Sequence, residues 1–419
     1  MTPEGTNTHS VRPAALSYRQ LLRAPELRAL LLATWLARLG GRMLSLAIVL
    51  YALARFGSPA LAGWLSFALL APGLLISPIA GALIDRAGAA WAITADMTTS
   101  AACLAILALA DRIGWASAPA LLAVCAMFSL TSPLSAAGIR TMLPRLVPRT
   151  VLDRANALDT SIHGLSDVVG PALAGLLVAL IGAAPTFALI ALLYAAAALC
   201  VGRTRYAERH PMPPRAGSLL AEALAGLIRV LRQPTLRGLA VCYGLYQVTW
   251  GVLIVAVPLL AARGFVTGPT DTAAGDVVAG IVWAAAGVAG AAGALAAGQF
   301  RAQGRERLVM ALGMIVTTIA VWPISAAFGL AGVAVGLMLV ALVAGPIDVS
   351  LLTLRQRRTD PRELGRVLSV SMSLNLAGIP VGSALAGMLL TWSMPGTLAV
   401  AAMASLLAAA SVRFVPAQE

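Results

Sequence analysis

Residues 22–33 read LRAPELRALLLA, and residues 231–242 read LRQPTLRGLAVC, so the same pattern returns 209 positions later. Two further matches follow in the same order. GPALAGLL at 170–177 corresponds to GSALAGML at 382–389, and the pair Pro148-Arg149 corresponds to Pro361-Arg362. The offsets are close to half of the 419 residues. The chain is therefore predicted to consist of two halves with the same architecture, running in the same direction.

The composition places these halves in a lipid bilayer. Hydrophobic residues make up 59% of the chain and charged residues only 11%, which excludes a soluble enzyme because a soluble domain has about 25% charged residues. A helix that crosses a membrane needs about 20 apolar residues, and no strand pattern competes. We predict an all-α membrane protein with twelve spans, six in each parallel-repeat bundle: 27–54, 60–83, 92–110, 118–138, 155–181, 185–202, 235–262, 276–298, 307–328, 332–352, 365–391 and 395–412.

The basic residues set the orientation. All 30 of them are arginine, and they give a net charge of +13. With twelve spans, 25 arginines fall in segments on the side of the termini, three (Arg55, Arg112 and Arg263) fall on the other side, and two lie within the first span. Cytoplasmic loops are enriched in basic residues, so both termini are expected in the cytoplasm of a bacterium, with the chain in its inner membrane. The charge is thus topological and does not indicate nucleic-acid binding.

The predicted segments follow from these spans. We expect a polar N-terminal tail at 1–26 without a cleavable signal peptide, and a C-terminal tail at 413–419. The two six-helix bundles are predicted at 27–202 and 235–412, joined by a cytoplasmic linker at 203–234 that is rich in proline and arginine.

A loop motif follows the second span. Gly81, Asp85, Arg86 and Gly88 stand in the stretch GALIDRAG, which resembles the G-x-L-x-D-R-x-G loop of the major facilitator superfamily. The resemblance implies that the Asp85 carboxylate accepts hydrogen bonds from a helix N-terminus in the other half and holds the cytoplasmic side shut. The family usually has a basic residue after Gly88, whereas this chain has Ala89.

The fifth span points to one branch of that superfamily. Gly164, Gly170, Pro171 and Gly175 resemble the glycine-proline motif of drug:proton antiporters. Glycines let helices approach closely and proline bends them, and Gly170 is expected at the contact between the halves. Residues 140–158, RTMLPRLVPRTVLDRANAL, resemble the corresponding loop of macrolide-efflux-like and siderophore-exporter-like members. The fourth span lacks the basic residue that many such antiporters carry there.

Ionisable residues inside the spans are the candidate coupling site, because charge at membrane depth is costly. Arg38 and Arg42 lie one turn apart in the first span, and His163 and Asp167 lie one turn apart in the fifth. We expect an Arg–Asp pair between these spans, serving either as a structural salt bridge or as a proton-coupling switch. Asp348 in the tenth span is a second candidate for protonation. Asp96 in the third span is expected to pair with loop arginines.

An aromatic face in the seventh span is the candidate substrate contact. Tyr243, Tyr246, Gln247 and Trp250 are spaced as one side of a helix, which would suit an amphiphilic, flat or cationic molecule in a cavity. Lipid contact or internal packing are the alternatives. The four cysteines fall singly in apolar runs, and no metal site, cofactor site or catalytic motif is predicted.

The sequence therefore predicts a monomeric secondary transporter, not an enzyme, that exports a drug, siderophore or secondary metabolite in exchange for protons. Two alternatives stay open at this stage. The first is an uptake or facilitated-diffusion carrier of the same superfamily. The second is a membrane regulator or assembly partner that transports nothing. Intramembrane arginine and aspartate argue against the second alternative.

The loop motif generates a first prediction. Asp85→Asn should impair transport while leaving the protein inserted in the membrane, because the acceptor of the proposed latch loses its charge. Transport by vesicles that contain equal amounts of the variant and the wild-type protein checks this. Wild-type rates in the variant would show that the loop only sets topology.

Overall fold

The computed structural model describes residues 23–148, 152–203, 227–228, 230–264, 272–299, 305–358, 370–371 and 373–416. Most of the expected N-terminal tail and linker lie outside these residues, as do 365–369 of the expected eleventh span. Within the described residues the chain is built from helices and carries no strand.

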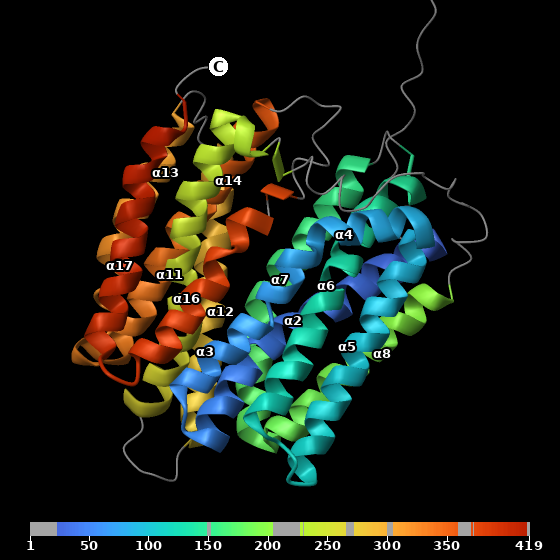
Figure 1. Cartoon of the computed structure of the whole chain (residues 1–419), viewed down its shortest axis with the longest axis horizontal. Helices are drawn as coiled ribbons and strands as arrows, with labels where there is room; N and C mark the ends of the chain where they lie inside the picture. The colour runs from blue at the N-terminus through green and yellow to red at the C-terminus, as the bar shows by residue number, and fades with distance from the viewer. Residues whose placement is uncertain are drawn as a thin grey trace, which may run out of the picture.

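Seven α-helices form the first half, which lies on the right in Figure 1. Their bounds are α2 (Pro25–Phe56), α3 (Pro59–Ala68), α4 (Ala71–Ala87), α5 (Ala89–Arg112), α6 (Ala118–Leu146), α7 (Leu152–Ile181) and α8 (Ala183–Gly202). The second half comprises α11 (Pro234–Gly264), α12 (Thr272–Gln299), α13 (Glu306–Ala320), α14 (Gly329–Arg357), α16 (Gly378–Leu389) and α17 (Met394–Ser411), with short 3₁₀ turns at Ala326–Phe328 and Val412–Phe414.

Ten of the described helices are long and apolar enough to cross a membrane, and Ser373–Leu389 is a shorter apolar helix. Together with α13, which has 15 residues, they account for the twelve predicted spans. The second span is divided into α3 and α4 at Leu69 and Leu70. Pro72 explains this break, because its missing N–H cannot donate to the carbonyl four residues earlier.

Apolar side chains fill the inside of each half. In the first half the core runs along α2, where Met43, Ile48 and Leu50 are at most 1% exposed. In the second half Tyr246 packs with Met310 and Met314 of α13. The many exposed large apolar side chains on the outer helices are in keeping with a lipid surrounding.

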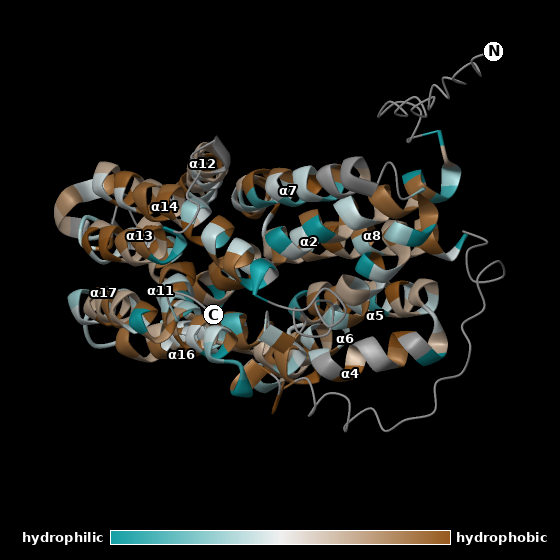
Figure 2. Cartoon of the chain, turned by 90° about the horizontal axis from the view of Figure 1, so that it is seen from above, coloured by the Kyte–Doolittle hydropathy of each residue, from teal (hydrophilic) through white to brown (hydrophobic). Residues whose placement is uncertain are grey.

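Two pairs of helices make most of the contact between the halves: α7 packs against α12, and α3 packs against α16. Both views place α7 beside α12 at the boundary of the two groups (Figure 1 and Figure 2). A Cβ atom on Gly280 of α12 would lie 2.8 Å from the main-chain oxygen of Pro171, and one on Gly387 of α16 would lie 2.9 Å from that of Pro59. Small residues are therefore required at these contacts.

The glycines at these contacts show which end of the molecule is joined. Among the described residues, the glycines that directly approach the opposite half are Gly63, Gly175, Gly280, Gly287 and Gly387. They lie near the starts of α3 and α12, the ends of α7 and α16, or the middle of α12. The halves are thus in close contact at the end away from the termini, which we call the far end. We call the end with the termini the arginine-rich end.

The expected place of Gly170 is wrong. A Cβ atom on Gly170 would overlap Arg42 of α2 in the same half, whereas one on Gly175 would overlap the main-chain oxygen of Asp276 in the other half. The two glycines are five residues apart, so they lie on different sides of α7. Gly170 sets the distance between α7 and α2, and Gly175 sets the distance between α7 and α12.

This packing predicts that Gly175→Leu holds the far end open, because the leucine side chain cannot fit against Asp276 and Gly280. A cysteine introduced beside the contact should then react faster with a maleimide added from that side. Gly164→Leu is the matched control, since a Cβ at Gly164 meets nothing within 4 Å. Equal labelling of the two variants would contradict this account of the contact.

Candidate functional site

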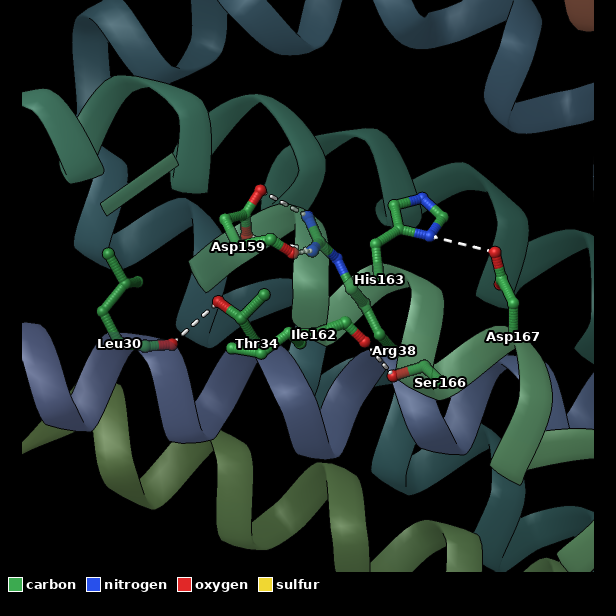
Figure 3. A network of polar contacts seen from close by, with 8 residues as sticks. All are labelled: Leu30, Thr34, Arg38, Asp159, Ile162, His163, Ser166 and Asp167. Carbon is green, nitrogen blue, oxygen red and sulfur yellow. Dashed lines mark hydrogen bonds and ion pairs between the residues drawn. The ribbon is translucent and has the colours of Figure 1, made fainter. Parts of the chain in front are cut away.

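The first of two ion pairs between α2 and α7 lies nearer the arginine-rich end. The Arg38 guanidinium donates to the main-chain oxygen of Asp159 at 2.8 Å and to its Oδ2 at 3.1 Å. Figure 3 shows the side chain reaching from α2 to Asp159 on α7. The side chains of Arg38 and Asp159 are 25% and 22% exposed. Two contacts from one planar guanidinium fix the relative position of the two helices.

The second ion pair lies deeper. Arg42 pairs with the Asp167 carboxylate, and the Nδ1 atom of His163 lies 3.3 Å from Oδ2 of the same carboxylate. Arg42 is near the middle of the 32-residue α2, and Asp167 is near the middle of the 30-residue α7. Their side chains are 47% and 39% exposed, and that of His163 is 51% exposed. This deeper pair is therefore more accessible than the outer one.

The acidic side of both pairs forms one stripe on α7. Asp159, His163 and Asp167 are spaced four residues apart, so they lie on one face of the helix. Arg140, in the last third of α6, is attracted by Asp159 and repelled by Arg38. Sequence reasoning missed Asp159 and Arg140 as members of the network. The D-x3-H-x3-D spacing on α7 is the signal that could have identified Asp159.

This geometry gives Asp167 two possible bonding arrangements. When ionised, the carboxylate attracts Arg42 and accepts from His163 if that ring carries a proton on Nδ1. When Asp167 is protonated, the attraction is lost and Arg42 becomes an unpaired cation at membrane depth, which is costly. Arg42 must then move toward another acceptor. Proton uptake at one oxygen can thus be converted into movement of a side chain on the neighbouring helix.

The motif glycines around this network have different surroundings. Gly164 faces open space, Gly170 faces Arg42, and Pro171 and Gly175 face α12. Pro171 lies inside α7. The α7 motif therefore connects the ion pair on one side with the contact between the halves on the other.

The loop motif is described in part. Gly88 has φ = +89°, a conformation that favours glycine, and it both ends α4 and precedes α5. Arg86 lies in the last turn of α4 and is exposed. The surroundings of Gly81 and of the Asp85 side chain lie outside the described residues. The proposed latch stays a prediction.

Two further acids differ in their surroundings. Asp96 is buried, and its partners are the hydroxyl groups of Ser100, Thr131 and Ser135. The expectation that Asp96 pairs with loop arginines is wrong, since these hydroxyls surround it within the bundle. Asp348 on α14 is exposed and accepts a hydrogen bond of 2.5 Å from the Tyr243 hydroxyl on α11. The Tyr243 side chain is therefore engaged with Asp348 on α14 and is not free to contact a substrate in this conformation.

The other members of the predicted aromatic face also pack internally. Tyr246 is completely buried in the core of the second half, so in this conformation it does not line an open cavity. Gln247 is buried against Gly378, and the half-buried Trp250 lies against Trp283 of α12, with ring centres 6.4 Å apart. These residues do lie on one helix, α11, as their spacing predicts. Side chains and backbone of α12, α13 and α16 cover the aromatic face that they form.

The comparisons with known proteins identify the family. The profile of the Major Facilitator Superfamily matches residues 30–302. An MFS-type transporter of Sinorhizobium fredii, y4rN, is 50% identical over 402 residues, which are 96% of this chain and 97% of that protein. The multidrug efflux pump Tap of Mycolicibacterium fortuitum is 29% identical over 329 residues, 75% of this chain and 77% of that protein.

A solved structure has the same fold. The nucleoside transporter NupG superimposes with a TM-score of 0.70 over 93% of this chain and 98% of that chain, at 13% identity. With twelve crossing segments in two halves, a multidrug efflux pump among its relatives, and a profile match over more than half its length, this chain belongs to the major facilitator superfamily of membrane transporters.

Proposed function

We propose that the protein exports an amphiphilic small molecule, such as a drug, siderophore or secondary metabolite, in exchange for protons. The observation that carries this proposal is the half-exposed Arg42–Asp167–His163 network in the middle of α2 and α7. Ionisable groups at this depth are retained at a cost in stability, which a transport function would justify. The similarity to the multidrug efflux pump Tap supports export as the direction.

The orientation is part of the proposal. The arginine-rich end would face the cytoplasm of a bacterium, because 25 of the 30 arginines fall in segments on that side. The far end would then face the periplasm. We also propose, from the sequence, two six-helix bundles at 27–202 and 235–412 with a linker between them. We propose that the protein is a monomer.

The proposed cycle alternates between two states of Asp167. In the conformation described above, the far end is closed and Asp167 holds Arg42, which requires an ionised carboxylate. We assign this state to a carrier that has released its proton to the cytoplasm and is ready to bind substrate. After the halves rock to open the far end, a periplasmic proton binds Asp167 and frees Arg42 as the substrate leaves.

The glycine-proline motif of α7 would link the protonation of Asp167 with the opening of the far end. Asp167 is on the same helix as Pro171 and Gly175, and its own main-chain oxygen would lie 3.2 Å from a Cβ at Gly287 of α12. Movement of α7 relative to α2 therefore changes the contact between the halves directly. The outer pair, Arg38–Asp159, is less exposed and is proposed to serve as the fixed point about which α7 moves.

This mechanism predicts that Asp167→Asn abolishes proton release caused by substrate but preserves substrate binding. The substrate is chosen first. It is a drug whose inhibition of growth is relieved when efflux-deficient bacteria express the chain. Proton release is measured on purified protein in weakly buffered solution. The variant should lose roughly 1–2 kcal/mol of stability, less than a fully buried pair would, because it leaves Arg42 unpaired but partly hydrated.

Two variants make this experiment specific. Arg42→Gln added to Asp167→Asn should recover thermal stability without recovering proton release. Asp159→Asn removes the matched carboxylate on the same helix and should still release protons. Wild-type proton release by Asp167→Asn would move the coupling site elsewhere, with Asp348 as the next candidate.

A further inference from the structure

A groove lies on the outer surface of the first half, between α5 and α8. It has a volume of about 490 Å³. Its walls include Thr94, Thr98 and Ala101 of α5, and Ala195, Ala198 and Arg203 of α8. In both views α5 and α8 lie on the side of the first half that is farthest from the second half (Figure 1 and Figure 2). The groove is therefore separate from the Arg42–Asp167 network and from the contact between the halves.

The groove is mainly apolar, because the polar residues in its walls are limited to Thr94, Thr98 and Arg203. The Thr94 hydroxyl donates to the main-chain oxygen of Ala90 at 2.9 Å. The methyl group of Thr94 would lie 3.8 Å from a Cβ atom on Gly202. The three alanines leave room between larger residues such as Leu199, which is 58% exposed. A hydrocarbon chain would bury apolar surface along this floor, and the Thr94 hydroxyl would keep its main-chain partner.

One end of the groove carries positive charge. Arg203 follows the last residue of α8 at the arginine-rich end and is exposed. Within the described part of the chain its guanidinium makes no hydrogen bond or ion pair. Arg205 and Arg209 follow in the sequence, with one acid, Glu208, among them. An anionic group at this end would meet a cation that is free of other described partners.

The dimensions match one leaflet of a bilayer. Ala195 and Arg203 are eight residues apart, which is about 12 Å along a helix, and half of the hydrocarbon thickness is about 15 Å. Trp91 on α5 is 51% exposed and lies about one turn before Thr94. Tryptophan at this level is typical of the membrane–water interface. The charged end of the groove is thus at headgroup depth, and the alanines are at acyl-chain depth.

We propose that this groove binds an anionic phospholipid. Its phosphate would pair with Arg203, and one acyl chain would lie against Thr98, Ala101, Ala195 and Ala198. Guanidinium and phosphate form strong charge-assisted hydrogen bonds. A zwitterionic lipid offers the same chain, but its phosphate is already neutralised by its own cationic group, so the charge at Arg203 selects for the anionic headgroup.

Native mass spectrometry of the purified full chain tests this site. The protein is mixed with equal amounts of phosphatidylglycerol and phosphatidylcholine that carry identical acyl chains. The wild-type protein should retain phosphatidylglycerol preferentially. Arg203→Gln should lower that retention about fivefold, the effect of losing one basic residue near a lipid surface. Ala195→Leu should fill the groove and lower the retention of both lipids.

The control is Arg413→Gln, which removes an exposed arginine near the end of the second half, where its guanidinium lies 5.1 Å from the Phe414 ring centre. This variant should retain lipid like the wild type. Equal retention of the two lipids by the wild type, unchanged retention by Arg203→Gln, or the same loss in Arg413→Gln would each overturn the proposal. Unfolding temperatures of the variants establish that each one is folded.

Discussion

Ionised side chains cannot remain unpaired in the middle of a bilayer, and this constraint fixes how α2 and α7 pack. A charged side chain at the centre of a membrane helix costs roughly 3 kcal/mol. Three such groups, Arg38, Arg42 and Asp167, left unpaired would cost about 9 kcal/mol, which is the size of the whole stability of a typical domain. The pairs Arg38–Asp159 and Arg42–Asp167 remove most of this cost. They also make the distance between α2 and α7 depend on ionisation.

The two sides of α7 connect this electrostatic constraint with packing between the halves. On one side Gly170 allows α7 to approach Arg42, and on the other Gly175 allows it to approach α12. Dispersion forces and small residues hold the halves together at the far end, with no ion pair across that contact among the described residues. Such a contact can separate and re-form at little cost, whereas the ion pairs respond to protons. The proposed transport cycle uses the first property for movement and the second for coupling.

The sequence predicted the fold well because the membrane sets the composition and the span length, and because the repeat can be read directly from the sequence. It predicted the site less well. The spacing of charges predicts an Arg–Asp pair between the first and fifth spans. It does not identify Asp159, near the start of the fifth span, as the partner of Arg38, because an arginine side chain can reach acids that lie a full turn apart. Helical spacing correctly placed Tyr243, Tyr246, Gln247 and Trp250 on one face. It could not show that other helices cover that face, because a single sequence does not reveal which neighbours pack there.

The same limit explains the two glycines of α7. A motif of closely spaced glycines indicates that helices approach, but their direction around α7 decides whether the partner is α2 or α12, and this direction is known only once the halves are placed. Asp96 is a similar case. Its partners, Ser100, Thr131 and Ser135, carry no charge, so no pattern of charges along the sequence could identify them.

The central claim is that the ionisation of Asp167 controls the contact between the halves. The most direct test is double electron–electron resonance. It measures the distance between spin labels on α7 and α12 at the far end, at neutral pH and at mildly acidic pH. The account predicts that acidification changes the proportion of molecules with this end open in the wild-type protein, and that Asp167→Asn has one distance distribution at both pH values. The same pH response in Asp167→Asn as in the wild type would contradict it.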